Sequence, residues 1–148
     1  MTFLNEDEAA EKRVLSEARV IAVVGYSPQA HRASHRIGQY LQGVGYKVYP
    51  VNPTVDEIDG MKSYPALKDV PEPIDIVDVF RQPQHLPGIV REAIDAGAKT
   101  VWAQMGVTHE DAKQAALEAG LNYAEDRCIM VEHRRLLPDT ANKPRPSE

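Results

Sequence analysis

Short apolar runs alternate along this chain with longer segments whose apolar residues have helical spacing. The apolar runs are rich in β-branched residues, and we predict buried strands at 20–24, 47–51, 74–80, 100–104 and about 122–125. Between them, apolar residues recur on one face of a helix, as at Ile37, Tyr40, Leu41 and Val44. Strands that alternate with helix-length segments are typical of right-handed βαβ units in one parallel sheet.

The pattern therefore predicts an α/β fold, with a single Rossmann-like domain over residues 1–137. We expect a five-stranded parallel sheet with helices on both faces and, counting strands along the chain, the order 3-2-1-4-5. Asp75 and Asp78 are unusual in a strand that is covered on both sides, so one of them should lie near a strand end or meet a partner. Residues 138–148 contain three prolines and no apolar face, which predicts a disordered tail.

Four loops should meet at one edge of this sheet. Ligands of open parallel sheets bind beyond the carboxyl ends of the strands, near the point where the strand order reverses. The segments that follow the first four strands are Gly25 to Ser34, Asn52-Pro53, Arg81-Gln82-Pro83 and Met105-Gly106. We take these loops as the candidate binding site.

The first loop differs from the dinucleotide fingerprint. Gly25 ends the first strand, but no further glycine occurs before Ser34, whereas a GxGxxG turn needs later glycines for close approach to a pyrophosphate. After the second strand, the acidic residue that would accept from a ribose hydroxyl is replaced by Asn52-Pro53. Both differences argue against NAD binding.

The same loop carries hydroxyl and cationic side chains in front of a predicted helix. Ser27, Arg32, Ser34 and Arg36 could join the backbone N–H groups of the helix start in an anion site. Simpler interpretations stay open, because Ser34 can be a helix cap and the two arginines can be solvated surface charges. We interpret the histidines at 31 and 35 as exposed loop residues. Arg81 directly follows a buried strand, so for this residue we favour a ligand-binding role.

Five segments in register resemble the small bacterial CoA-binding proteins, whose single domain is similar to the N-terminal CoA-binding domain of the succinyl-CoA synthetase α subunit. The segments that carry this resemblance are Ala22-Val-Val-Gly-Tyr-Ser-Pro28, Tyr49-Pro-Val-Asn-Pro53, Asp75-Ile-Val-Asp-Val-Phe-Arg81, Val101-Trp-Ala-Gln-Met-Gly106 and Glu125-Asp-Arg-Cys-Ile-Met-Val-Glu132. They extend over most of residues 18–137.

The resemblance implies that coenzyme A lies along the strand ends. Its phosphates would lie on the first loop and helix, and its adenosine part between the loops after the second and third strands. The resemblance implies binding roles for Gly25, Tyr26, Ser27, Arg36, Asn52, Pro53, Phe80 and Arg81, with Met105 and Gly106 near the pantetheine end. The 3′-phosphate of CoA, which NAD lacks, suits a basic loop.

We expect a stand-alone protein that binds CoA or acyl-CoA and lacks the ligase machinery. One alternative is an NAD(P)-dependent oxidoreductase, which tighter binding of NAD(H) than of CoA would support. Another is a transferase or redox sensor that uses Cys128, which an unusually reactive thiol would support. No spacing of histidine or cysteine predicts a metal site.

Charge and composition narrow the class of partner. The chain has 17 basic and 22 acidic side chains and a net charge of −5, so it has no general attraction to nucleic acid or to an anionic membrane. One cysteine cannot form an intramolecular disulfide and suits a reducing compartment. No apolar stretch approaches the roughly 20 residues that span a bilayer. These features predict a cytoplasmic protein with a small-molecule ligand, and they indicate nothing about protein partners.

Overall fold

The fold is built on one parallel sheet in a computed structural model, of which residues 1–140 are described. Its five strands lie in the order β2-β1-β5-β6-β7. They are β1 (Val20–Val24), β2 (Lys47–Val51), β5 (Ile76–Val79), β6 (Thr100–Ala103) and β7 (Asn122–Ala124). A two-stranded hairpin of β3 (Glu57–Ile58) and β4 (Met61–Lys62) lies beyond β2.

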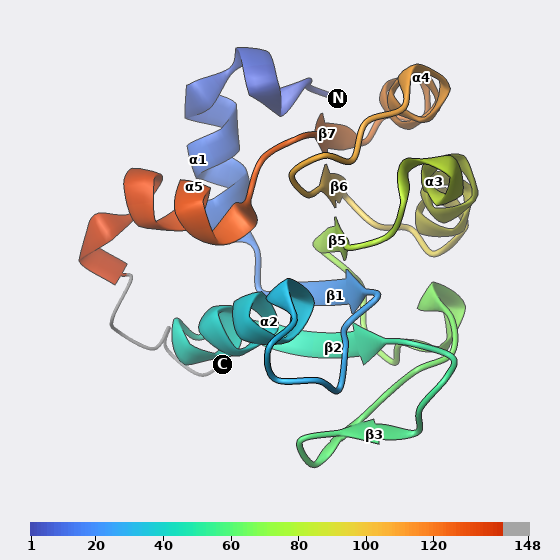
Figure 1. The fold of residues 1–148 in the computed structure, drawn as a ribbon. Coiled ribbons are helices and arrows are strands. Elements are labelled where there is room, and N and C mark those ends of the chain that lie inside the picture. The colour runs from blue at the N-terminus through green and yellow to red at the C-terminus, as the bar shows by residue number, and fades with distance from the viewer. Residues whose placement is uncertain (141–148) are drawn as a thin grey trace.

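Helices cover both faces of the sheet, as the sequence predicts (Figure 1). One layer consists of α1 (Glu8–Glu17), α2 (Ala33–Gly43) and α5 (Ile129–Leu136), and the other of α3 (Leu86–Asp95) and α4 (Glu110–Glu118). Short 3-10 turns occur at Leu4–Glu6, Leu67–Asp69, Pro83–His85 and Pro138–Thr140.

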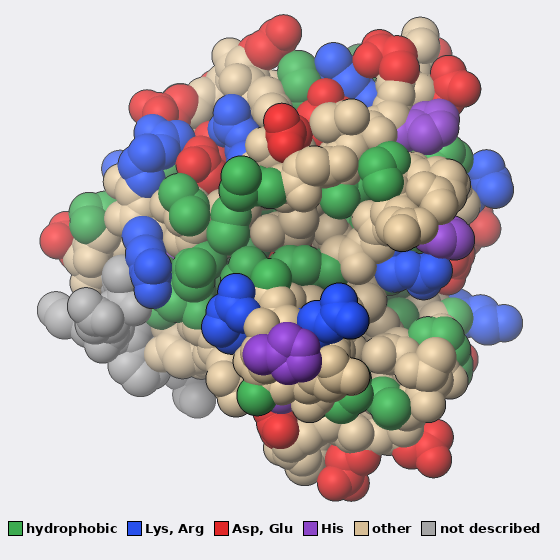
Figure 2. Space-filling view, in the orientation of Figure 1, with side chains coloured by type: hydrophobic (Ala, Val, Ile, Leu, Met, Phe, Trp, Pro, Cys, Tyr) green, Lys and Arg blue, Asp and Glu red, His purple; other side chains and the backbone are tan. Residues whose placement is uncertain are grey.

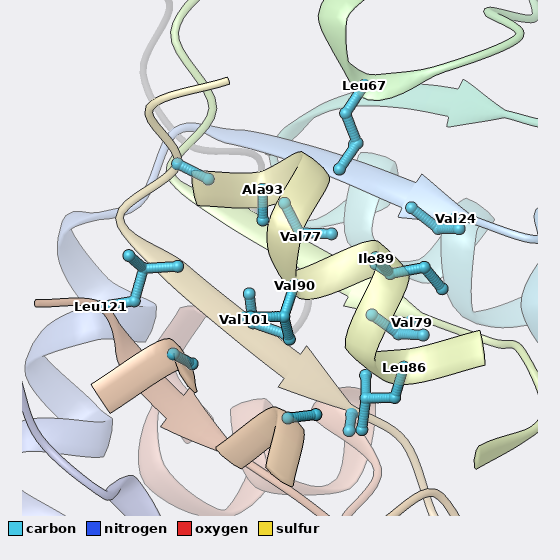
Figure 3. Packing of buried hydrophobic residues seen from close by; sticks show 14 of the residues in the cluster. Val24, Leu67, Val77, Val79, Leu86, Ile89, Val90, Ala93, Val101 and Leu121 are labelled. Carbon is cyan, nitrogen blue, oxygen red and sulfur yellow. The ribbon is translucent and has the colours of Figure 1, made fainter. Parts of the chain in front are cut away.

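Side chains alternate between two cores because successive residues of a strand point to opposite faces. In β1, Ala22 and Val24 face α3 and α4, whereas Ile21 and Val23 face the α1, α2 and α5 layer. Figure 3 shows the first core, where α3 lies over the sheet and Leu67 joins the cluster from the 3-10 turn. For this reason β1, which is buried on both faces, is a continuous apolar run.

The predicted strand order is wrong in one respect. In the count used above, the observed order is 2-1-3-4-5, so the third strand pairs with the first and does not lie outside the second. The reason is the connection after β2, in which Tyr64 pairs beside Val51 and Leu67 then packs on the α3 face. A right-handed crossover on that face leads back past β1. The order therefore reverses between β1 and β5.

The segment predicted as a tail begins with the 3-10 turn Pro138–Thr140, and its residues 141–148 lie outside the described part of the chain. Among the helices of residues 1–140, none has the length and apolar character needed to cross a membrane.

The two aspartates of β5 and its approach have different environments. Asp75 precedes the strand and accepts hydrogen bonds from the backbone N–H groups of Arg19 and Val20, both at 2.9 Å. Asp78 lies in the middle of β5 between Val23 and Trp102, and it is fully buried. Neither of its carboxyl oxygens has a hydrogen-bond partner within residues 1–140. Burial raises the pKa of Asp78 well above the usual range of a carboxyl group.

Replacing Asp78 by valine should stabilise the protein, most of all at alkaline pH. Because its pKa is raised by folding, the proton on Asp78 contributes stability that is complete in acid and is lost as the pH rises. We expect Asp78→Val to raise the free energy of unfolding at pH 8 by about 1–3 kcal/mol, measured by urea denaturation. The Asp78→Asn variant, which cannot ionise at this position, should have a free energy of unfolding between those of the unsubstituted protein and the valine variant. A less stable valine variant at pH 8 would mean that the carboxyl group has a partner.

Candidate functional site

Three of the four predicted loops meet where β1 and β5 end side by side. Gly25 follows β1 with a φ of +88°, and a Cβ atom at this position would lie 2.5 Å from the carbonyl oxygen of Phe80. The backbone N–H of Gly25 donates to the carbonyl of Val51 at the end of β2. The loops after β2 and β5 therefore flank Gly25 on its two sides. This is the reversal point of the strand order, where parallel sheets bind ligands.

The loop between β1 and α2 is fixed from within by two consecutive residues of α2. The backbone N–H of Ser27 donates to Oγ of Ser34 at 2.9 Å, and the Ser27 carbonyl lies 2.8 Å from Nδ1 of His35. Ser34 is therefore a loop brace, since the cap position falls on Arg32. The interpretation of His35 as an exposed residue is wrong, because this side chain is only 2% exposed.

Asn52 has a similar bracing role after β2. Its Nδ2 donates to the carbonyl of Tyr26 at 2.9 Å, and its Oδ1 accepts from the backbone N–H of Thr54 at 2.9 Å. The hydroxyl of Ser63 donates to the Asn52 carbonyl. The amide side chain that replaces the acidic residue of NAD-binding sheets thus ties the loop after β2 to the start of the loop after β1.

A cavity of about 500 Å³ opens between these loops and α3. Its volume is in the range of small-molecule sites. Eleven residues line it: Val24, Gly25, Val51, Asn52, Pro53, Thr54, Pro65, Leu67, Arg81, Ile89 and Glu92. Gly25, Asn52, Pro53 and Arg81 belong to the predicted set, whereas Glu92 was missed because nothing in its helix distinguishes it from other exposed charges.

Two exposed arginines lie at the start of α2, at the end of the loop that continues from Gly25. Arg32 and Arg36 are both exposed, and Arg36 donates to the carbonyl of His31. Figure 2 shows two basic side chains flanking a histidine on the surface over this loop. No salt bridge of Arg32 occurs within residues 1–140, so its guanidinium group is available to an anion.

The remaining predicted residues lie at different depths. Tyr26 is buried, and its ring packs so closely on Gly38 that a Cβ there would lie 2.2 Å from it, so the ring points into the core. Burial, with a smaller effect of the Asp59 carboxylate, raises the pKa of Tyr26 to about 12. Phe80 is half-buried, and Met105 is 70% exposed one strand further along the edge. The backbone N–H of Gly106 donates to Asp126 at 2.7 Å.

Cys128 is half-buried and directly precedes α5. The next backbone N–H, that of Ile129, donates to Oε1 of Gln104 at 3.2 Å, so this cysteine lies near the end of β6. His133, the nearest histidine in sequence, is buried and lies 2.7 Å from the hydroxyl of Tyr40 through Nδ1. Within residues 1–140 no group of three histidine, cysteine or acidic side chains could hold a metal ion.

Comparison with known proteins identifies the family. The family described as CoA binding domain matches residues 19–134, which include all of the loops above. The chain belongs to this CoA-binding family. It is 42% identical over 129 residues to the uncharacterized protein YneT of Bacillus subtilis, with 87% of this chain and 96% of YneT aligned.

Two other proteins are similar to this chain, one in structure and one over a part of its sequence. A hypothetical protein from Pyrococcus horikoshii OT3 has a solved structure that superimposes with a TM-score of 0.87 at 39% identity, covering 93% of this chain and 97% of that one. An ADP-forming acetate–CoA ligase of Archaeoglobus fulgidus is 30% identical over 109 residues, which are 72% of this chain and 16% of the ligase. The chain therefore corresponds to one portion of that ligase.

Replacing Gly25 by alanine should destabilise the protein at the start of the loop between β1 and α2. A residue with a Cβ at a left-handed φ costs about 1–2 kcal/mol, and the contact with the Phe80 carbonyl must also be relieved. We expect a loss of at least about 2 kcal/mol in the free energy of unfolding, measured by urea denaturation. Gly43→Ala is the matched control, because a Cβ at this helical position meets no atom within 4 Å. This control should leave the free energy of unfolding unchanged or raise it by up to about 0.5 kcal/mol, because Gly43 is the last residue of α2. Equal effects of the two substitutions would contradict the proposed close packing.

Proposed function

We propose that the protein binds coenzyme A or an acyl-CoA along the carboxyl edge of the sheet, as a binding protein without ligase activity. Membership of the CoA-binding family supports the choice of ligand. The observation that carries the proposal is a cavity of about 500 Å³ that is lined by Gly25 at the end of β1 and by Arg81. The loop that continues from Gly25 to α2 carries the exposed Arg32, and the first turn of α2 carries the exposed Arg36. A nucleotide with several phosphates needs both an apolar recess and a cationic surface.

The phosphates would lie on the loop between β1 and α2. The first amides of a helix have no intrahelical acceptor, and the helix dipole favours an anion in front of them. In α2 the backbone carbonyl of Arg32 accepts from the N–H groups of His35 and Arg36, which leaves the amides of Ala33 and Ser34 outside this bonding. Guanidinium groups from Arg32 and Arg36 would add charge-assisted hydrogen bonds.

The adenosine part would enter the cavity between the loops after β2 and β5. Gly25 and Pro53 leave room there, and Leu67 and Ile89 provide apolar contact for a base. The pantetheine arm would then extend over β5 toward Met105 and Gly106 at the end of β6. From β1 to β6 the pantetheine arm would cross two strand spacings of about 4.8 Å each.

NAD fits the same edge less well. A sheet that binds NAD presents a carboxylate to the ribose hydroxyls at the end of its second strand. Here Asn52 occupies that position, and its side chain already bonds Tyr26 and Thr54. The basic residues nearby favour a ligand with an additional phosphate, as CoA has.

Isothermal titration calorimetry with CoA, 3′-dephospho-CoA and NAD⁺ tests the proposal. We expect CoA to bind most tightly, because it alone combines a diphosphate with a 3′-phosphate. Arg32→Ala and Arg81→Ala should each weaken CoA binding about tenfold to a hundredfold if the guanidinium group bonds a phosphate. The substitution that removes the partner of the 3′-phosphate should also abolish the preference for CoA over 3′-dephospho-CoA.

Arg13→Ala is the matched control, because Arg13 is an exposed arginine of α1, which does not contribute to the cavity. It should bind CoA with unchanged affinity. Absence of CoA binding at millimolar concentration would refute the proposal, and tighter binding of NAD⁺ than of CoA would favour an oxidoreductase instead.

A further inference from the structure

The buried imidazole of His35 lies between two hydrogen-bond acceptors. Its Nδ1 is 2.8 Å from the carbonyl oxygen of Ser27, and its Nε2 is 2.8 Å from Oδ2 of Asp59. A carbonyl oxygen can only accept, and so can an ionised carboxylate. If both contacts are hydrogen bonds and Asp59 is ionised, both ring nitrogens donate and the ring carries two protons. His35 would then be a cation in a buried residue, directly beneath the loop that would hold the phosphates.

Asp59 lies in the turn between β3 and β4, and no pattern in the sequence predicts that this turn contacts the loop between β1 and α2. It forms the turn of the β3–β4 hairpin with Gly60, and both residues have positive φ values, 51° and 79°. Its Oδ2 also lies 3.4 Å from Nε2 of Gln39 on α2. His35 on α2 thus contacts Asp59 at the hairpin tip with one ring nitrogen and the Ser27 carbonyl with the other.

We propose that His35 and Asp59 form a proton-dependent brace of the phosphate loop, so that affinity for the phosphates of the ligand falls when His35 loses its second proton. This inference rests on the proposed function and adds a positioning residue to it. A neutral imidazole can donate to only one of its two acceptors, so either the Ser27 carbonyl or Asp59 loses its bond. The loop also loses one positive charge while the charge of Asp59 remains.

The other charged and titratable groups near His35 can be separated from the effect of its protonation on ligand affinity. The Tyr26 ring packs edge to face on the His35 ring, with 5.6 Å between the ring centroids. The pKa of Tyr26, raised to about 12, keeps the phenol neutral between pH 7 and pH 9. Arg32 and Arg36, on the same loop and helix, stay charged throughout. His31 is a second imidazole of this loop, so the binding measurements use the background His31→Gln.

Nuclear magnetic resonance of the unliganded protein tests the protonation state directly. Ring ¹⁵N shifts distinguish an imidazole with two protons from either neutral tautomer, and the signals of His35 are identified by their loss in His35→Asn. We expect two protons on His35 at pH 7 in the unsubstituted protein and one in Asp59→Asn. Asparagine keeps the positive φ of this turn, and Asn-Gly is favoured in such hairpins, so the fold should persist. A singly protonated His35 at pH 7 would overturn the proposal.

Calorimetry tests the link to the ligand. Titrations use CoA alkylated on sulfur, so that its thiol does not titrate, between pH 7 and pH 9, where its 3′-phosphate, with a second pKa of about 6, is already mostly ionised. We expect the affinity to fall about fivefold over this range, as for the loss of one nearby charge, and to vary less than about twofold in Asp59→Asn. Equal pH dependence with and without Asp59→Asn would overturn the proposal. If the alkylated CoA does not bind at pH 7, the proposed function fails, and the ring spectrum alone decides the state of His35.

Discussion

The pairing of β1 with β5 is the constraint on which the candidate site depends. These strands end together, and Gly25 approaches the carbonyl of Phe80 so closely that no side chain fits between them. The contact brings the first loop next to Arg81, while the N–H of Gly25 reaches back to Val51 at the end of β2. A cavity can therefore form from three segments that are distant in sequence. Without this approach the loops would surround separate spaces.

Part-buried hydrogen bonds then brace the loop between β1 and α2. Ser34 accepts from the backbone N–H of Ser27, His35 contacts the Ser27 carbonyl, and Asn52 donates to the carbonyl of the preceding residue, Tyr26. These bonds satisfy backbone groups that would otherwise be buried without partners, which is costly. They also leave the exposed cations at the surface, where a ligand can reach them. Preorganised loops reduce the entropy that binding would otherwise lose.

The sequence predicts the sheet well because burial on both faces produces uniform apolar runs, such as Val20 to Val24. It does not predict the strand order, which depends on which face the connection after β2 follows. Leu67 on the α3 face and the pairing of Tyr64 beside Val51 determine that path, and neither has a local signal.

The place of the cavity could be predicted from the rule that loops after parallel strands share one edge. Gly25, Asn52, Pro53 and Arg81 of the predicted loops line it. The bracing roles of His35 and Asp59 could not be predicted, because their contact joins a helix to a hairpin turn 24 residues away. The inward direction of Tyr26 also depends on a tertiary feature, the space above Gly38.

Hydrogen exchange with and without CoA, followed by mass spectrometry of peptides, tests most directly that CoA binds at this edge of the sheet. We expect CoA to slow exchange in the loop 25–34 and in the segments around Asn52 and Arg81. Exchange in α1 and α4, away from these loops, should remain unchanged. Slower exchange confined to α1 and α4, or no change in the loop 25–34 at a saturating concentration of CoA, would contradict it.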